Sequence, residues 1–226
     1  MTNYCFQPAP QTIVPIQGSD QVFPVRRITC VGRNYAAHRR EMGGDDREPP
    51  FFFAKPADAI APPGVDPAYP SATSNLHHEV ELVVALGAGG ADIAVGDALS
   101  LVFGYAVGVD LTRRDLQASA RDKGHPWDAS KGFDQSAPIS AIHRHLDHPP
   151  EGRIQLSVNG ATRQNAALTD MIWNVPEIIA EASRLWRLAP GDLIYTGTPE
   201  GVGALVKGDL VEATAEGVAE LRFKVV

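Results

Sequence analysis

The chain has 226 residues, of which 44% are hydrophobic and 21% are charged, and its formal net charge is −7 at pH 7. This length accommodates one sizeable hydrophobic core, and the negative charge argues against nucleic acid or an anionic membrane as the main partner. No segment approaches the roughly 18 apolar residues of a membrane span, and the first residues do not resemble a signal peptide. We therefore expect one main domain in the cytoplasm, acting on a small molecule.

The first residues are interpreted as a lead-in to this domain. Residues 1–24 are rich in proline and polar side chains, which predicts an extended segment before a single domain over residues 25–226. A strand is predicted at residues 25–32. Two cysteines are too few for a disulfide framework, so Cys30 is expected to be a buried thiol of this strand.

A short helix is predicted after the first strand, with Asn34 as its cap and Gly43 at its end. His38 and Glu41 are three residues apart and share one face of this helix. A carboxylate that holds one imidazole nitrogen leaves the other free as a general base that activates water. A routine surface charge pair has the same spacing, and spacing alone favours that simpler interpretation.

The next predicted strand is FFFAKP at residues 51–56, and it is expected to be buried. Lys55 stands at its end, where it either extends toward solvent or binds an anion. Residues 58–73 contain several prolines, which predicts a loop with short edge strands at most.

Two carboxylates interrupt an otherwise apolar strand predicted at residues 75–86. Side chains alternate between the two faces of a strand, so Glu79 and Glu81 share one face. They are about 6 to 7 Å apart along the strand, close enough to bind one cation and too close to remain charged comfortably without it. The simpler alternative for an isolated E-x-E pattern is a solvent-facing strand edge.

A second strand, predicted at residues 100–111, ends in a single carboxylate. Gly104, Ala106 and Gly108 precede Asp110 on one face, and such small residues are expected to leave a hollow for a ligand. If this face lies beside the two glutamates, three oxygen ligands suit Mg²⁺ or Mn²⁺. The alternative is that Asp110 is only an anion at the start of the following helix.

That helix is predicted to begin at Thr112, with Asp115 completing a variant capping box. Three polar residues share one of its faces at positions i, i+3 and i+7: Arg114, Gln117 and Arg121. This face is interpreted either as solvent-exposed or as a carboxylate-binding wall beside the metal. Lys131 follows in a turn-rich segment, where it either neutralises a substrate anion or is a solvated loop lysine.

The C-terminal half is predicted to be mostly scaffold. The three histidines of residues 141–152 are interpreted as parts of a surface loop: His143, His145 and His148. Asn159-Gly160 predicts a type I′ hairpin turn. Asn174 is expected to open a helix that runs to about Trp186 and places Leu185 and Trp186 in its core-facing stripe. Short strands separated by glycine turns then complete a compact β-roll.

Several common catalytic motifs are absent from the sequence. It contains no G-x-G-x-x-G, no G-x-S-x-G and no H-E-x-x-H pattern. We therefore expect no nucleotide, and neither serine hydrolase nor zincin chemistry.

Seven segments, in order from about residue 25 to the end, resemble the fumarylacetoacetate hydrolase family, and its small acylpyruvase and fumarylpyruvate hydrolase members above all. They are VGRNYAAHRREMG, PFFFAKP, NLHHEVEL, GYAVGVDLTRRDLQ, KGHPWDASKGFD, VNGATRQ and DLIYTGTPEGVG. The resemblance implies an α+β fold that is predominantly β, a mixed β-roll like the C-terminal domain of that family, with a few short helices. It also implies a homodimer.

The resemblance further implies roles for individual residues. Glu79, Glu81 and Asp110 would bind Mg²⁺ or Mn²⁺, while His38 and Glu41 would lie on a lid and activate water. The substrate contacts would come from four residues: Arg114, Gln117, Lys131 and Thr198. The distal end of the substrate has five candidate cations that the sequence does not rank: Arg33, Arg39, Lys55, Arg121 and Lys123.

These roles predict a metal-dependent hydrolase that cleaves the carbon–carbon bond of an acylpyruvate, with fumarylpyruvate as the favoured substrate and a place in aromatic catabolism. Lys131 would then help to stabilise the pyruvate enolate that leaves. The alternative is an oxaloacetate decarboxylase or tautomerase that uses the same metal site without an attacking water. A non-catalytic, metal-dependent oxoacid-binding module is the third and least favoured hypothesis.

Overall fold

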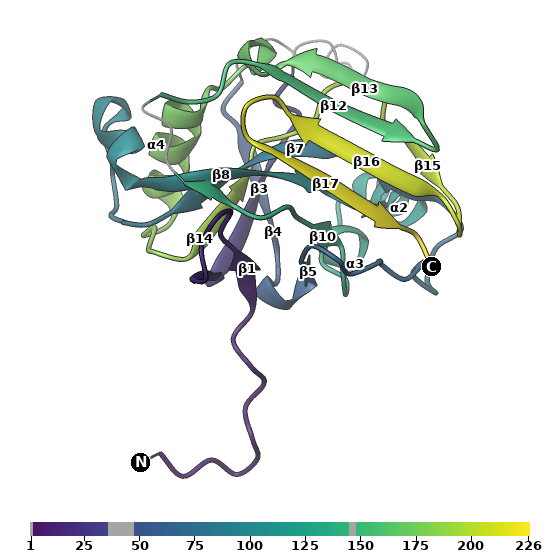
Figure 1. The fold of residues 1–226 in the computed structure, drawn as a ribbon, viewed down its shortest axis with the longest axis horizontal. Helices are drawn as coiled ribbons and strands as arrows, with labels where there is room; N and C mark the ends of the chain where they lie inside the picture. Colours follow the sequence, from purple (N-terminus) through teal and green to yellow (C-terminus); the bar gives the residue numbers. More distant parts are fainter. Residues whose placement is uncertain (1, 36–47, 145–147) are drawn as a thin grey trace.

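A computed structural model describes residues 2–35, 48–144 and 148–226, and it is organised around a six-stranded mixed sheet (Figure 1). The strands lie in the order β11-β8-β7-β14-β3-β4. Their bounds are β3 (Arg27–Gly32), β4 (Phe51–Lys55), β7 (Val80–Leu86), β8 (Val102–Val109), β11 (His143–Arg144) and β14 (Asp192–Tyr195). β14 pairs parallel to β3, whereas the other neighbouring pairs are antiparallel.

A second, antiparallel sheet covers one face of the first and has the strand order β13-β12-β16-β17 (Figure 1). Its strands are β12 (Arg153–Val158), β13 (Ala161–Ala167), β16 (Leu210–Ala215) and β17 (Ala219–Lys224). The β12–β13 turn has positive φ at both Asn159 (53°) and Gly160 (78°), so the predicted type I′ hairpin is confirmed.

The remaining strands form three small sheets. One has the order β15-β6-β9 and contains β6 (Leu76–His78), β9 (Thr112–Arg113) and β15 (Gly203–Leu205). The other two are pairs: β1 (Ile13–Pro15) with β2 (Val22–Pro24), and β5 (Ile60–Ala61) with β10 (Ala137–Pro138). The predicted class, α+β and predominantly β, is confirmed by this strand content.

The described helices are few and short. They are α2 (Arg114–Lys123), α3 (Asp128–Lys131) and α4 (Val175–Leu185), with the 3₁₀ turns η1 (Ala57–Ala59), η2 (Val95–Leu101) and η3 (Leu168–Asp170). α4 begins as predicted, because the Asn174 side chain accepts a hydrogen bond from the Glu177 N–H and Glu177 bonds back to Asn174. Leu185 and Trp186 are 61% and 38% exposed, so their assignment to the core was wrong.

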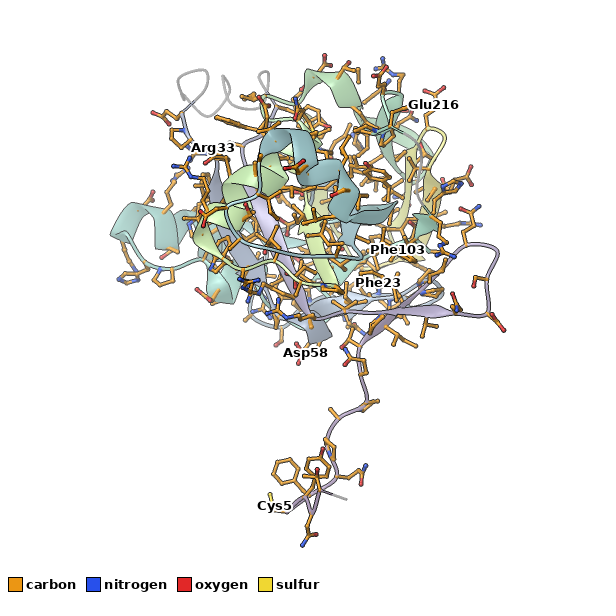
Figure 2. All side chains as sticks on the ribbon, turned by 90° about the vertical axis from the view of Figure 1, so that its left-hand side faces the viewer. Cys5, Phe23, Arg33, Asp58, Phe103 and Glu216 are labelled. Atoms are coloured by element: carbon orange, nitrogen blue, oxygen red, sulfur yellow. The ribbon has the colours of Figure 1, made fainter. Side chains whose placement is uncertain are left out.

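Both faces of the central sheet are buried, which explains why all seven residues of β7 are buried. Val80, Leu82, Val84 and Leu86 pack in the core shared with the second sheet and α4. The opposite face packs in a second core with the β1–β2 pair, where Phe23 lies 5.5 Å from Phe103 between ring centroids (Figure 2). Glu81, in β7, and Glu79, immediately before it, are therefore buried rather than on a solvent-facing strand.

Several local expectations were wrong. α2 begins at Arg114 rather than Thr112, because Thr112 pairs with His77 in the β6–β9 ladder. Asp115 does not complete the expected capping box but accepts hydrogen bonds from Thr73 and Ser74. β4 was expected to be buried, yet Phe51 is 39% exposed.

The expected ligand hollow above Gly104 and Gly108 does not exist. A Cβ at Gly104 would meet the His143 carbonyl oxygen at 2.3 Å, and one at Gly108 would meet the Tyr195 ring at 2.6 Å. These glycines admit neighbouring groups of the protein rather than a ligand. His143 is thus not part of a surface loop but pairs with Tyr105 at the edge of the sheet, while residues 145–147 lie outside the described chain.

The chain before β1 is extended, and Figure 2 shows Cys5 on this arm, away from the body. Cys5 is exposed and Cys30 is buried, and both are free thiols, as predicted for Cys30. No helix within the described ranges is long and apolar enough to cross a membrane.

Asn34 connects three segments immediately after β3. Its Nδ2 donates to the Trp173 carbonyl at 2.9 Å and to the Thr196 carbonyl at 2.8 Å, and its Oδ1 accepts from the Trp173 N–H at 2.8 Å. The helix that Asn34 was predicted to cap lies outside the described residues. Within them, this fully buried amide ties β3 to the chain before α4 and to the end of β14.

We predict that Asn34→Ala lowers the free energy of unfolding by about 3 kcal/mol, because three buried polar groups lose their partner. Urea denaturation monitored by circular dichroism measures this loss. Asn3→Ala, on the exposed arm, is the matched control. Equal denaturation midpoints for the two variants would contradict this role of Asn34.

Candidate metal and active site

Three carboxylates meet beside the central sheet. Glu79 lies between β6 and β7, Glu81 lies in β7, and Asp110 follows β8. The Asp110 N–H donates to the Glu79 carbonyl at 2.8 Å, which holds the two chain segments together. Oxygen atoms of the three carboxylates lie within 4.8 Å of one another, and all three residues are buried. The alternative of two solvent-facing glutamates is therefore wrong.

Lys131 lies between two of these carboxylates. Its Nζ is 2.7 Å from Glu79 Oε2, 2.5 Å from Asp110 Oδ2 and 2.7 Å from Thr112 Oγ1. Burial by itself would lower the pKa of Lys131, but Asp110 and Glu79 outweigh it and raise that pKa, so the ammonium form is favoured. The residue is 2% exposed at the end of α3, so the alternative of a solvated loop lysine is wrong.

Two further cations complete the ion pairs. Lys55 Nζ lies 2.8 Å from Asp110 Oδ1 and is fully buried, and Arg114 pairs with Glu79. Burial by itself would raise the pKa of Glu79, but Lys131 and Arg114 hold it well below its usual range. Glu79 and Asp110 are therefore paired carboxylates.

Glu81 has no ion pair among the described residues. Its Oε2 accepts a hydrogen bond from the Gly197 N–H at 2.7 Å. Burial raises the pKa of Glu81 well above its usual range, and the charges of Asp110 and Glu79 raise it further. Glu81 is thus the member of the cluster that most needs an additional cation.

The donor set fits a hard divalent cation. Carboxylate oxygens are the ligands that Mg²⁺ and Mn²⁺ prefer. Asp110 Oδ1 is buried and accepts no hydrogen bond from any described residue, because Lys55 approaches it outside hydrogen-bond angles. Glu79, Glu81 and Asp110 together could hold such an ion, which would bring positive charge to Glu81 and a further partner to Asp110 Oδ1.

A cavity of about 200 Å³ opens over this cluster. Arg114 and Gln117 line it from α2, and the Gln117 Oε1 accepts a hydrogen bond from Arg114. Arg33 also lines it, at a left-handed φ of 57° immediately after β3. The other lining residues are Val31, Gly32, Phe51, Phe53, Glu79, Glu81, Ala118, Arg121, Trp127, Lys131 and Val202.

The predicted catalytic dyad cannot be placed in this site, and one predicted substrate contact does not line the cavity. His38 and Glu41 lie outside the described residues. Thr198 is 4% exposed and is not among the residues that line the cavity. It is nevertheless close to the cluster along the chain, because the preceding Gly197 N–H holds Glu81.

Gln164 connects the segment of Thr198 to β6 and β7 by hydrogen bonds, although its own segment was expected to be only scaffold. Gln164 Oε1 accepts from the Val80 N–H at 3.1 Å and lies 2.9 Å from His78 Nδ1. Its Nε2 donates to Thr198 Oγ1 at 2.8 Å and to the Pro199 carbonyl at 2.9 Å. The signal in the sequence was an amide at an inward-facing position of a strand, which requires buried partners.

These hydrogen bonds determine which atoms of Gln164, His78 and Thr198 donate and which accept. A backbone N–H only donates and a carbonyl only accepts, so the oxygen of Gln164 faces Val80 and its nitrogen faces Pro199. His78 Nδ1 must then carry a proton. Thr198 Oγ1 accepts from Gln164, which leaves the hydroxyl proton of Thr198 available to another acceptor.

We predict that Lys131→Met destabilises the metal-free protein by about 3 kcal/mol, because two buried carboxylates lose a shared cation. The same change removes positive charge from the cluster, so Mn²⁺ should raise the melting temperature of this variant more than that of the unaltered protein. Calorimetric melting with and without Mn²⁺ measures both effects. Lys123→Met, an exposed lysine at the end of α2, is the control, and a Mn²⁺ shift no larger in Lys131→Met than in this control would refute the idea.

A second prediction concerns Gln164. Gln164→Glu places a carboxylate against the Pro199 carbonyl and should lower the free energy of unfolding by about 2 to 4 kcal/mol. Gln155→Glu makes the same change at a half-buried position of the neighbouring strand β12. Urea midpoints of the two variants are compared, and a loss no greater for Gln164→Glu would show that the amide direction is unimportant.

Comparison with known proteins places this site in a family. Residues 27–226 match the family described as Fumarylacetoacetate (FAA) hydrolase C-terminal. The chain is 48% identical over 179 residues to the fumarylpyruvate hydrolase of a Ralstonia species, covering 79% of the chain and 93% of that relative. It is 44% identical over 202 residues to the mitochondrial oxaloacetate tautomerase FAHD1 of Rattus norvegicus, covering 88% and 91%.

The structural comparison agrees. The fold is similar to the crystal structure of fumarylpyruvate hydrolase from Pseudomonas aeruginosa in complex with Mn²⁺ and pyruvate, with a TM-score of 0.96, 50% sequence identity and 99% of each chain covered. The resemblance inferred from seven sequence segments, and the mixed β-roll that it implied, are confirmed.

Proposed function

The chain belongs to the fumarylacetoacetate hydrolase family, and we propose that it is a metal-dependent hydrolase that cleaves fumarylpyruvate to fumarate and pyruvate. The observation that carries this proposal is the buried cluster of three carboxylates at the cavity, in which Glu81 has no cation partner among the described residues. Support comes from the half-identical Pseudomonas aeruginosa relative, whose crystal structure contains Mn²⁺ and pyruvate.

The pyruvate end of the substrate would bind at the base of the cavity. Glu79, Glu81 and Asp110 would hold Mg²⁺ or Mn²⁺, which when bound supplies an electron sink for the keto oxygen. Arg114 and Gln117 are the proposed contacts of the pyruvate carboxylate, since a guanidinium and an amide can donate parallel hydrogen bonds to it. Thr198 does not line the cavity, so its contact with the substrate stays a prediction from the family resemblance.

The reaction is the addition of water across a carbon–carbon bond. His38, oriented by Glu41, would accept a proton from water while the water oxygen bonds to the acyl carbonyl carbon. The bond from that carbon to the methylene carbon then breaks, and its electron pair becomes the pyruvate enolate. The positive charge of Lys131 stabilises this anion until the methylene carbon takes up a proton. The products are one carboxylic acid and one pyruvate.

An absorbance assay with fumarylpyruvate, acetylpyruvate and oxaloacetate tests this proposal. With Mg²⁺ or Mn²⁺ added, we predict hydrolysis of both acylpyruvates with a higher kcat/KM for fumarylpyruvate. Pyruvate release is measured independently with a coupled dehydrogenase. A higher kcat/KM for oxaloacetate than for either acylpyruvate would overturn the proposal.

The second candidate is an oxaloacetate tautomerase or decarboxylase, and the observation in its favour is the 44% identity with a relative of that name. The two candidates differ in their need for an attacking water. His38→Ala should reduce acylpyruvate hydrolysis by about 100-fold or more if His38 is the general base. Full hydrolytic activity in this variant would remove His38 from the mechanism. A binding module without catalysis, the third candidate, would bind oxalate or pyruvate and release no product.

A further inference from the structure

The cavity contains two arginine side chains that the carboxylate cluster does not use. Of its four lining cations, Lys131 and Arg114 are paired with the cluster. Arg33 and Arg121 form no ion pair with a cavity carboxylate within the described ranges. In the part of the chain that the structure describes, Arg121 pairs only with its exposed neighbour Asp122, at 3.2 Å, and the buried Arg33 Nε has no hydrogen-bond partner. Both can therefore accept an anionic group in the cavity.

The structure reduces the candidates for the distal end of the substrate. Lys55 is committed to Asp110 below the cavity. Lys123 is two residues beyond Arg121, about 200° around the helix, and does not line the cavity. Arg39 lies outside the described residues. Arg33 and Arg121 are the described cations that remain, and Figure 2 shows Arg33 at the edge of the body.

The spacing along α2 matches a long substrate. Arg121 lies one turn beyond Gln117 and two turns beyond Arg114, about 6 and 10 Å along the helix axis. The seven-carbon chain of fumarylpyruvate spans roughly 8 Å between its terminal carbons. If Arg114 and Gln117 hold one end, the other carboxylate reaches the level of Arg121. Acetylpyruvate, with five carbons and no second carboxylate, does not.

Three aromatic side chains form an apolar part of the cavity wall. Phe51 and Phe53 both pack against Trp127, with ring centroids 5.3 and 5.8 Å apart, and all three line the cavity. The Arg33 guanidinium lies over the Phe51 ring at 5.9 Å, so its charge is next to this aromatic wall. A planar conjugated segment would fit along such aromatic faces.

We propose that Arg121 and Arg33 bind the distal carboxylate of a dicarboxylate acylpyruvate and select it over substrates with an uncharged acyl end. This assignment rests on the proposed function. The two arginines act on specificity: they hold the end of the substrate that does not react, and the carboxylate cluster and its cations act at the other end.

The test is the ratio of kcat/KM for fumarylpyruvate to kcat/KM for acetylpyruvate. We predict that Arg121→Gln and Arg33→Gln each lower this ratio about tenfold, mainly through KM, because each removes a charged hydrogen bond to one substrate only. Arg121→Lys should retain most of the preference. Arg33→Gln keeps the Cβ and therefore leaves the backbone cost of its left-handed φ unchanged. Lys123→Gln, the same charge change on α2 outside the cavity, should leave the ratio unchanged.

The outcomes are separable. A ratio within twofold of the unaltered protein in both arginine variants overturns the assignment, as does an equal fall in Lys123→Gln. If the unaltered protein hydrolyses acetylpyruvate but not fumarylpyruvate, the assignment fails and acylpyruvate hydrolysis stands. If it hydrolyses neither, the proposed function fails. In that case, calorimetric titration in the presence of Mn²⁺ measures the affinity for each compound. The ratio of the two affinities in the arginine variants and in Lys123→Gln then decides the assignment.

Discussion

The structure depends on the burial of three carboxylates on one side of its central sheet. Taking a carboxylate out of water costs several kcal/mol unless a partner compensates it. The compensation here comes from different elements: Lys55 from β4, Lys131 from α3 and Arg114 from α2. Because removing one partner of such a pair costs about 3 to 5 kcal/mol, each of these segments is tied to the sheet by charge as well as by packing. The site is therefore also part of what holds the fold together.

The central sheet supports this arrangement because its two faces have different tasks. One face of β7 is aliphatic and packs against the second sheet. On the other face, Gly108 pairs with Glu81 in the β7–β8 ladder, and its lack of a side chain makes room for the Tyr195 ring. A larger residue at Gly108 would displace β14, and Gly197, two residues after this strand, donates the hydrogen bond that holds Glu81. Packing on this face thus sets the position of Glu81, which has no ion pair with any residue that the structure describes.

The sequence predicted those parts of the site that follow from strand alternation. Glu79 and Glu81 share a face because side chains alternate, and Asp110 joins them because its strand pairs with theirs. What could not be predicted depends on contacts between distant segments. Lys55 was ambiguous because its partner lies 55 residues away, and Gln164 was overlooked because its partners lie at least 34 residues away in the chain.

The wrong predictions have the same origin. Small residues before Asp110 suggested a ligand hollow, but sequence does not reveal that a ring and a backbone carbonyl already fill it. Thr112 carries a good capping side chain, yet its backbone is used by a β-ladder and its hydroxyl by Lys131. Tertiary contacts thus outweigh local secondary-structure propensity wherever both would use the same backbone or side-chain group.

The side of the cluster that faces the second core constrains how protons can move. Cys30 and Tyr195 are paired neighbours in the β3–β14 ladder, and both are fully buried. Burial raises the pKa of the Cys30 thiol and of the Tyr195 hydroxyl, and the charge of Asp110 raises both further. Both groups are therefore neutral near pH 7 and neither accepts nor releases a proton there. The two groups beneath the cluster therefore supply no proton to the proposed reaction, and the groups that exchange protons with the substrate are to be sought on the cavity side of the carboxylates.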